Sequence, residues 1–167
     1  MYTEAQQMVM NLVKKFTVVS FILTFGVANA EETEHFPRHH LGVFAGAGIE
    51  KEHGHSESGY ALGLEYEFRF NERWGLGVDL ERLFGDETDR SEVVAMPLSF
   101  HPNEHWRLFF GPGYEFHDKK DKFLFRTGVA YEWELKNGWS LSPEIIADFL
   151  EGGAKTYLAG IAIGRGF

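Results

Sequence analysis

The chain has 167 residues, about the length of one domain, and it contains no cysteine, which excludes disulfides and thiolate metal sites. Its formal net charge of −9 at pH 7 argues against nucleic-acid binding, because the neutralisation of phosphates requires a basic surface. Aromatic residues make up 16% of the chain and there are 19 glycines, a composition that favours β-strands in close contact.

The N-terminal segment, residues 1–30, has the pattern of a secretory signal peptide. Lys14 and Lys15 precede an apolar run over residues 16–27, and small residues follow at the expected cleavage point. The run is shorter than the roughly twenty residues that a membrane-spanning helix needs. We expect cleavage after Ala30, with residues 1–7 as an upstream extension, residues 31–39 as a polar lead-in and residues 40–167 as the folded domain.

Strict alternation of side-chain character runs through the rest of the chain. Every second residue over 60–70 is apolar or aromatic, the residues between are small or charged, and the pattern resumes over 74–80 after a short turn. Successive side chains of a strand point to opposite faces, so this stretch is predicted to be a β-hairpin. The same pattern predicts eight strands in all, over residues 40–50, 60–70, 74–80, 92–101, 106–117, 122–135, 139–150 and 155–167.

The predicted connections form two alternating sets. Tight turns are expected at residues 71–73, 102–105 and 136–138, whereas mostly longer and more charged loops are expected at 51–57, 85–91, 118–121 and 151–154. Because consecutive strands run in opposite directions, the tight turns share one end of an up-and-down barrel and the loops share the other.

The tryptophans distinguish the two kinds of closed barrel that fit this alternation. Trp74, Trp106 and Trp139 each follow a tight turn and Trp133 precedes one, so all four fall at one end of the apolar face. Such an aromatic ring is typical of the lipid–water interface of a transmembrane barrel. A soluble ligand-binding barrel turns its apolar face inward instead. The alternative is a secreted β-sandwich or lipocalin-like barrel.

From about residue 40 to residue 167 the chain resembles the small eight-stranded bacterial outer-membrane barrels of the OmpA and OmpX type. In the last strand Tyr157, Ile161, Ile163 and Phe167 match the C-terminal pattern of this class, whereas Arg165 departs from its usual aromatic residue. The resemblance implies an all-β, antiparallel up-and-down transmembrane barrel in the outer membrane, with periplasmic termini and turns.

The same resemblance implies the partners of the chain. They are outer-membrane lipids, lipopolysaccharide and the assembly machinery that recognises the last strand. It implies no cofactor, and we expect a monomer.

A charged network is predicted on the lumen face, formed by Glu65, Glu67, Arg69, Asp79, Glu81, Arg107, Glu115, Arg126, Glu132, Glu134, Glu144 and Asp148. Side chains fill the interior of an eight-stranded barrel, so these charges must be paired or hydrated.

Counting residues through the hairpins predicts which of these residues face one another. It places Arg107 opposite Glu132, His117 opposite Lys122 and Glu65 opposite Asp79. The last two carboxylates should share a proton, recruit an arginine from across the lumen or hold a cation.

These features favour a membrane-structural or porin-like barrel with a mostly closed, acidic lumen. A gated, cation-preferring path is one alternative. A lipid A-modifying enzyme is another, although the His-x-Ser pair of the outer-membrane deacylases is absent and we expect no catalytic residue. A surface adhesion barrel is a third, although the loops are short. His53 and His55, and a cluster at residues 35, 39 and 40, could bind a metal, but solvated histidines are the simpler interpretation, and we predict no metal site.

Overall fold

The computed structural model describes residues 37–52, 54–85, 90–117 and 121–167. The predicted signal peptide and most of the lead-in lie outside the described residues. The elements are β1 (His39–Glu52), β2 (His55–Arg69), β3 (Trp74–Phe84), β4 (Arg90–Ala95), β5 (Leu98–Phe100), β6 (Trp106–His117), β7 (Lys122–Tyr131), β8 (Trp133–Glu134), the short 3₁₀ turn η1 (Lys136–Gly138), β9 (Trp139–Leu150) and β10 (Lys155–Gly166).

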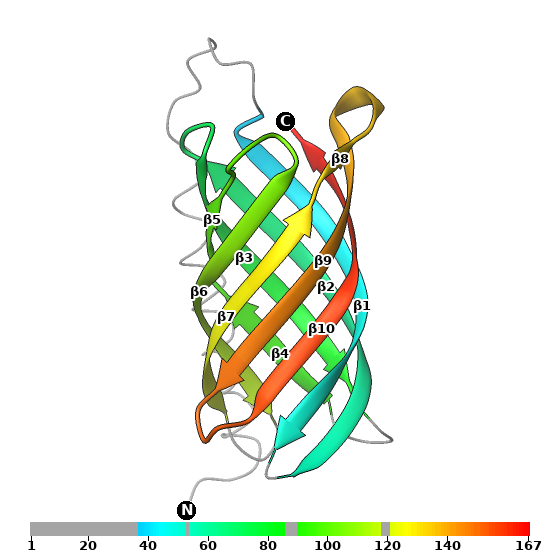
Figure 1. The fold of residues 1–167 in the computed structure, drawn as a ribbon, viewed down its shortest axis with the longest axis vertical. Helices are drawn as coiled ribbons and strands as arrows, with labels where there is room; N and C mark the ends of the chain where they lie inside the picture. The colour runs from blue at the N-terminus through cyan, green and yellow to red at the C-terminus, as the bar shows by residue number, and fades with distance from the viewer. Residues whose placement is uncertain (1–36, 53, 86–89, 118–120) are drawn as a thin grey trace, which may run out of the picture. The chain divides into compact units, whose positions relative to one another are not determined.

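The strands close into one antiparallel barrel (Figure 1). Closure comes from β10, which pairs with both β9 and β1. β4 and β5 are two halves of one strand, since both lie between β3 and β6. β7 and β8 likewise both pair with β9. The barrel therefore has eight strands in up-and-down order, which confirms the predicted fold class.

Two strands have the predicted bounds, and the others differ at one or both ends. β6 and β9 cover residues 106–117 and 139–150 as expected. β1 and β2 continue farther into the expected loop 51–57, where Glu50 pairs with Glu57 and Glu52 pairs with His55. A backbone ladder needs no apolar side chains, so the polar pattern of this stretch was a misleading sign of a loop. The turn itself contains Gly54 at φ 86°.

The predicted strand over residues 92–101 is interrupted at Met96 and Pro97. Proline has no backbone N–H to donate to a neighbouring strand, and it is therefore usual at such breaks. The Pro97 carbonyl still accepts a hydrogen bond from Gly77 N at 2.7 Å, and Met96 N donates to Pro112 O at 2.9 Å. The break thus leaves β3 and β6 connected through the same strand.

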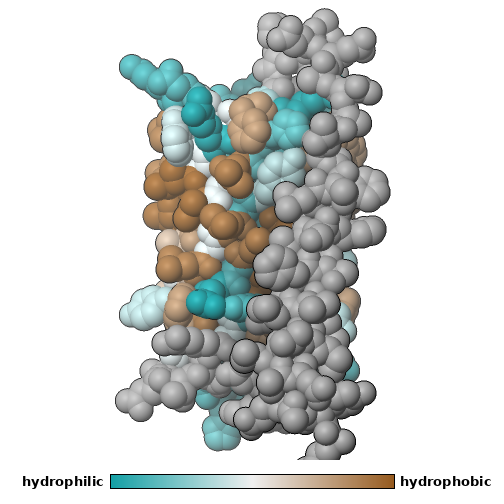
Figure 2. Space-filling model, turned by 180° about the vertical axis from the view of Figure 1, so that it is seen from behind, coloured by the Kyte–Doolittle hydropathy of each residue, from teal (hydrophilic) through white to brown (hydrophobic). Residues whose placement is uncertain are grey.

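The outer face of the barrel is apolar over its central part. Figure 2 shows a hydrophobic band with hydrophilic residues above and below it. Large apolar side chains remain exposed on every side, including Tyr60 at 72% and Ile145 at 61%. A contiguous exposed apolar band of this kind marks contact with lipid. Within the described part of the chain, no helix has the length and hydropathy to cross a membrane.

Candidate functional site

Arg126 on β7 is the centre of the lumen. Its side chain is fully buried, and its guanidinium donates two hydrogen bonds to Glu81, at 2.6 and 2.8 Å, and two to Asp148, at 2.8 and 2.7 Å. A fifth, longer contact of 3.3 Å reaches Asp79. Two-pronged arginine–carboxylate pairs are strong and directional. One side chain therefore ties β7 and its neighbour β9 to β3 across the lumen.

Arg107 on β6 forms a second buried centre. It donates to Glu65 at 3.1 Å and also to Glu144, and its Nε lies 3.8 Å from Glu132. Glu65 stands directly opposite Asp79 in the β2–β3 register. Each of these two facing carboxylates forms an ion pair with a different arginine: Glu65 with Arg107, and Asp79 with Arg126.

The other two predicted cross-strand pairs are wrong by two residues. Lys122 stands opposite Glu115 and not His117, and Arg107 stands opposite Ala130 and not Glu132. The reason is that the pairing of β6 with β7 ends at Glu115 and Lys122. The connection between the two paired segments is therefore longer than the sequence suggested. The ion pair between Arg107 and Glu132 forms diagonally instead.

A third cluster of polar side chains lies toward the end of the barrel that carries the tight turns. Arg69 donates to both oxygens of Glu132, at 3.1 and 2.9 Å, and its Nε donates to Glu67 at 3.3 Å. His101 Nε2 lies 2.8 Å from Glu67, and both side chains are almost fully buried. His101 was not among the predicted lumen residues, although it is the last residue of the predicted strand over residues 92–101.

A buried histidine–serine pair was also not predicted from the sequence. His40 Nε2 and Ser140 Oγ lie 2.9 Å apart although they are 100 residues apart in the chain. Such a pair can activate a nucleophile. Both side chains are buried inside the barrel, where the acyl chains of a surrounding bilayer do not reach.

Two members of the predicted network lie away from its central ion pairs. Glu134 is exposed, because β8 pairs only with β9 and the hairpin that they form extends past the rim of the barrel (Figure 1). The prediction of a lumen position for Glu134 is therefore wrong. Glu115 is buried but lies at the opposite rim, where it lines a cavity described below.

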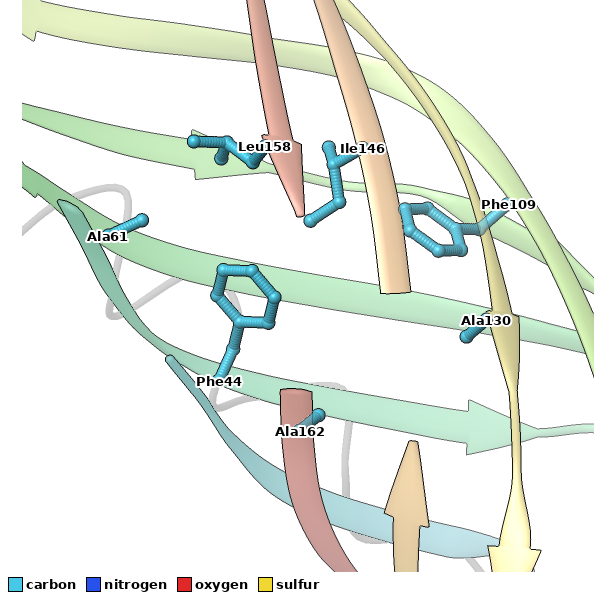
Figure 3. Close-up of a cluster of buried hydrophobic side chains, with 7 residues drawn as sticks. All are labelled: Phe44, Ala61, Phe109, Ala130, Ile146, Leu158 and Ala162. Carbon is cyan, nitrogen blue, oxygen red and sulfur yellow. The ribbon is translucent and has the colours of Figure 1, made fainter. Parts of the chain in front are cut away.

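Apolar side chains also fill the lumen, contrary to the expectation that its face carries only small and charged residues. A first cluster contains Phe44, Ala61, Phe109, Ala130, Ile146, Leu158 and Ala162 (Figure 3). A second contains Val93, Leu124, Leu150 and Ala154. Leu83 packs against both clusters, so they are continuous. Glycine at neighbouring lumen positions makes room for the phenylalanine rings: a methyl group on Gly160 or on Gly46 would lie 2.6 Å from the ring of Phe44.

Apolar and charged layers alternate along the barrel axis. On β7 the order from the loop end is Leu124, Arg126 and Ala130, followed by Glu132 just beyond the strand. On β9 the sequence Leu150, Asp148, Ile146 and Glu144 repeats the order apolar, charged, apolar, charged. A path through the lumen would cross every layer in turn.

The predicted interface residues lie on the outer face. Trp106, Trp133 and Trp139 are 42–49% exposed near the turns. Tyr131 makes edge contacts with Trp106 and Trp133, at centroid distances of 5.0 and 5.5 Å. Trp74 packs on Phe100 at 4.8 Å.

In the last strand the residues of the predicted assembly signal are also exposed on the outer face: Tyr157, Ile161, Ile163 and Phe167. The Arg165 guanidinium lies 6.0 Å from the ring centre of Trp139.

The predicted histidine clusters are only partly described. Among the described residues, no group of three potential ligands is positioned to hold a metal ion. His53 and His35, on which the two predicted clusters depend, lie outside the described residues. His39 forms a hydrogen bond at the end of the barrel that carries the tight turns, where its Nδ1 lies 2.8 Å from the Tyr66 hydroxyl.

Comparison with known proteins identifies the fold. No family model and no curated protein matches the chain. Among solved structures, Neisserial surface protein A is similar over 80% of this chain and 100% of its own, with a TM-score of 0.64 and 8% identity. The fold is that of the small outer-membrane β-barrels.

Two further solved barrels support this assignment. The attachment invasion locus protein Ail of Yersinia pestis covers 80% of this chain and 100% of its own, with a TM-score of 0.56 and 15% identity. OprG of Pseudomonas aeruginosa covers 80% and 98%, with a TM-score of 0.57 and 10% identity. At such identities the similarity extends to the fold alone. Together with the apolar outer band, it makes this chain a transmembrane barrel of the outer-membrane type.

Proposed function

We propose that the protein is a closed outer-membrane barrel with a structural role, whose lumen conducts neither ions nor solutes. The observation that carries this proposal is the apolar filling of the lumen at two levels, by the clusters around Phe44 and Leu124. An ion crossing such a layer would lose its hydration without gaining a partner, which costs many kcal/mol.

The charged layers support the same proposal. The guanidinium of Arg126 already binds three carboxylates, and that of Arg107 binds Glu65 and Glu144. Removing one partner from such a network leaves a buried charge without compensation. The network therefore favours one closed arrangement over an open one.

Recording from refolded protein in a planar lipid bilayer tests the closed lumen. We expect no stepwise current, with insertion verified independently by protease protection in vesicles prepared from the same sample. Stepwise cation-selective currents would contradict the proposal, and a change of those currents in Arg107→Ala would establish a path through the lumen.

A further inference from the structure

A cavity of about 520 Å³ opens at the loop end of the barrel, and we call it the vestibule. Its walls come from the ends of β1, β2, β3, β4, β6, β7 and β10. Its apolar lining includes Leu158, a member of the first apolar cluster, and Leu83, which packs on that cluster. A cavity of this size falls within the range of small-molecule sites. The first apolar cluster forms the floor of the vestibule through Leu83 and Leu158.

The lining of the vestibule is strongly acidic. Glu50, Glu52, Glu57 and Glu115 line it together with one lysine, Lys122. Lys122 Nζ donates to Glu52 Oε1 at 3.1 Å. Within the described part of the chain, no ion pair of 4.0 Å or less reaches the other three carboxylates.

The strand register places two of these carboxylates face to face. Glu50 on β1 stands directly opposite Glu57 on β2, and its partner on the other side is Thr156 on β10. Like charges directly opposite on neighbouring strands destabilise a sheet. A bound cation between them would remove that repulsion.

Thr156 provides a second, independent sign of a ligand. Its side chain lines the vestibule and is only 5% exposed, yet its hydroxyl has no hydrogen-bond partner among the described residues. Buried polar atoms are nearly always paired, and each exception calls for an explanation. Thr156 stands directly opposite Glu50 in the β1–β10 register, and both residues line the vestibule, so one ligand can contact both.

We propose that the vestibule binds a small organic cation, an aliphatic diamine in chemical class. Its ammonium groups, each with three donors, would bind the carboxylates of Glu50, Glu57 and Glu115 and donate to the Thr156 hydroxyl oxygen. Its methylene groups would pack on Leu83 and Leu158. The described residues hold no three-ligand metal group, and the cavity is far larger than one ion, so an organic cation fits better than a metal.

Calorimetric titration of the refolded protein in detergent micelles with putrescine tests this proposal. We expect saturable binding of one diamine per chain and none of its neutral diol analogue. Glu50→Gln should weaken the binding about tenfold or more, because it removes a charged hydrogen-bond partner. Glu104→Gln is the matched control: it makes the same change on an exposed residue in the turn between β5 and β6, at the opposite end of the barrel, and should leave the affinity unchanged.

Thr156→Val separates ligand binding from folding. It keeps the shape of the side chain and removes an unpaired hydroxyl, so the unliganded protein should unfold at the same or a higher denaturant concentration. Putrescine binding should nevertheless weaken. Absence of saturable binding, equal weakening by Glu104→Gln, or equal affinity for putrescine and Mg²⁺ would overturn the proposal. A current in the bilayer experiment would refute the closed lumen alone, because the vestibule does not depend on it.

Discussion

Replacement of Arg126 by methionine is expected to lower the free energy of unfolding by about 3–5 kcal/mol. The fully buried guanidinium is bound by Glu81, Asp148 and Asp79, and methionine would leave these buried carboxylates without a counter-charge. Denaturant unfolding of the refolded protein in detergent micelles, followed by its tryptophan fluorescence, measures this loss.

A second arginine of the same barrel provides the control. Arg82 bonds Glu92 at 2.6 Å, but the two side chains are 53% and 37% exposed. Exposed pairs contribute about 0–1 kcal/mol, so Arg82→Met should cost far less. Combining Arg126→Met with Glu81→Gln and Asp148→Asn should recover part of the loss, since the repulsion is then relieved. Equal losses for Arg126→Met and Arg82→Met would contradict the network described here.

Replacement of Phe44 by alanine is expected to cost about 3–5 kcal/mol, the usual loss for a buried aromatic residue. The ring is 0% exposed and lies against Gly46 and Gly160, so the backbone around it cannot collapse further without distorting the β1–β10 ladder. The same unfolding measurement applies.

Phe125 is the matched control for Phe44, because it lies on the outer face and is 45% exposed. Lipid or detergent fills the space left by Phe125→Ala, so no cavity forms and the loss should be smaller. If the two alanine variants lost equal stability, the apolar filling of the lumen would not hold the barrel together as inferred.

The alternation of side chains predicted the eight strands and the outward apolar face, because a strand repeats every two residues whatever surrounds it. The bounds of β6 and β9 followed from the tight turn predicted before each strand and the charged loop predicted after it. The facing carboxylates Glu65 and Asp79 also followed, since a three-residue turn between β2 and β3 left little freedom in the register.

Contacts across the lumen could not be predicted in the same way. The pairing of Arg126 with Glu81 depends on the tilt of the strands and the stagger of the whole barrel, neither of which a single hairpin specifies. The apolar clusters were overlooked because Phe44 and Ile146 interrupt a face dominated by glycine and charge. The glycines two residues on either side of Phe44 were an available signal, since they make the space that an inward ring needs.

Accessibility of a single spin label tests most directly whether the outer face lies in hydrocarbon. The chain has no cysteine, so Ile145→Cys provides one labelling site, at a 61% exposed position within β9. In lipid vesicles we expect molecular oxygen to reach the label readily and a water-soluble nickel chelate to reach it poorly. A label relaxed mainly by the nickel chelate would show that this face meets water, and would contradict the account.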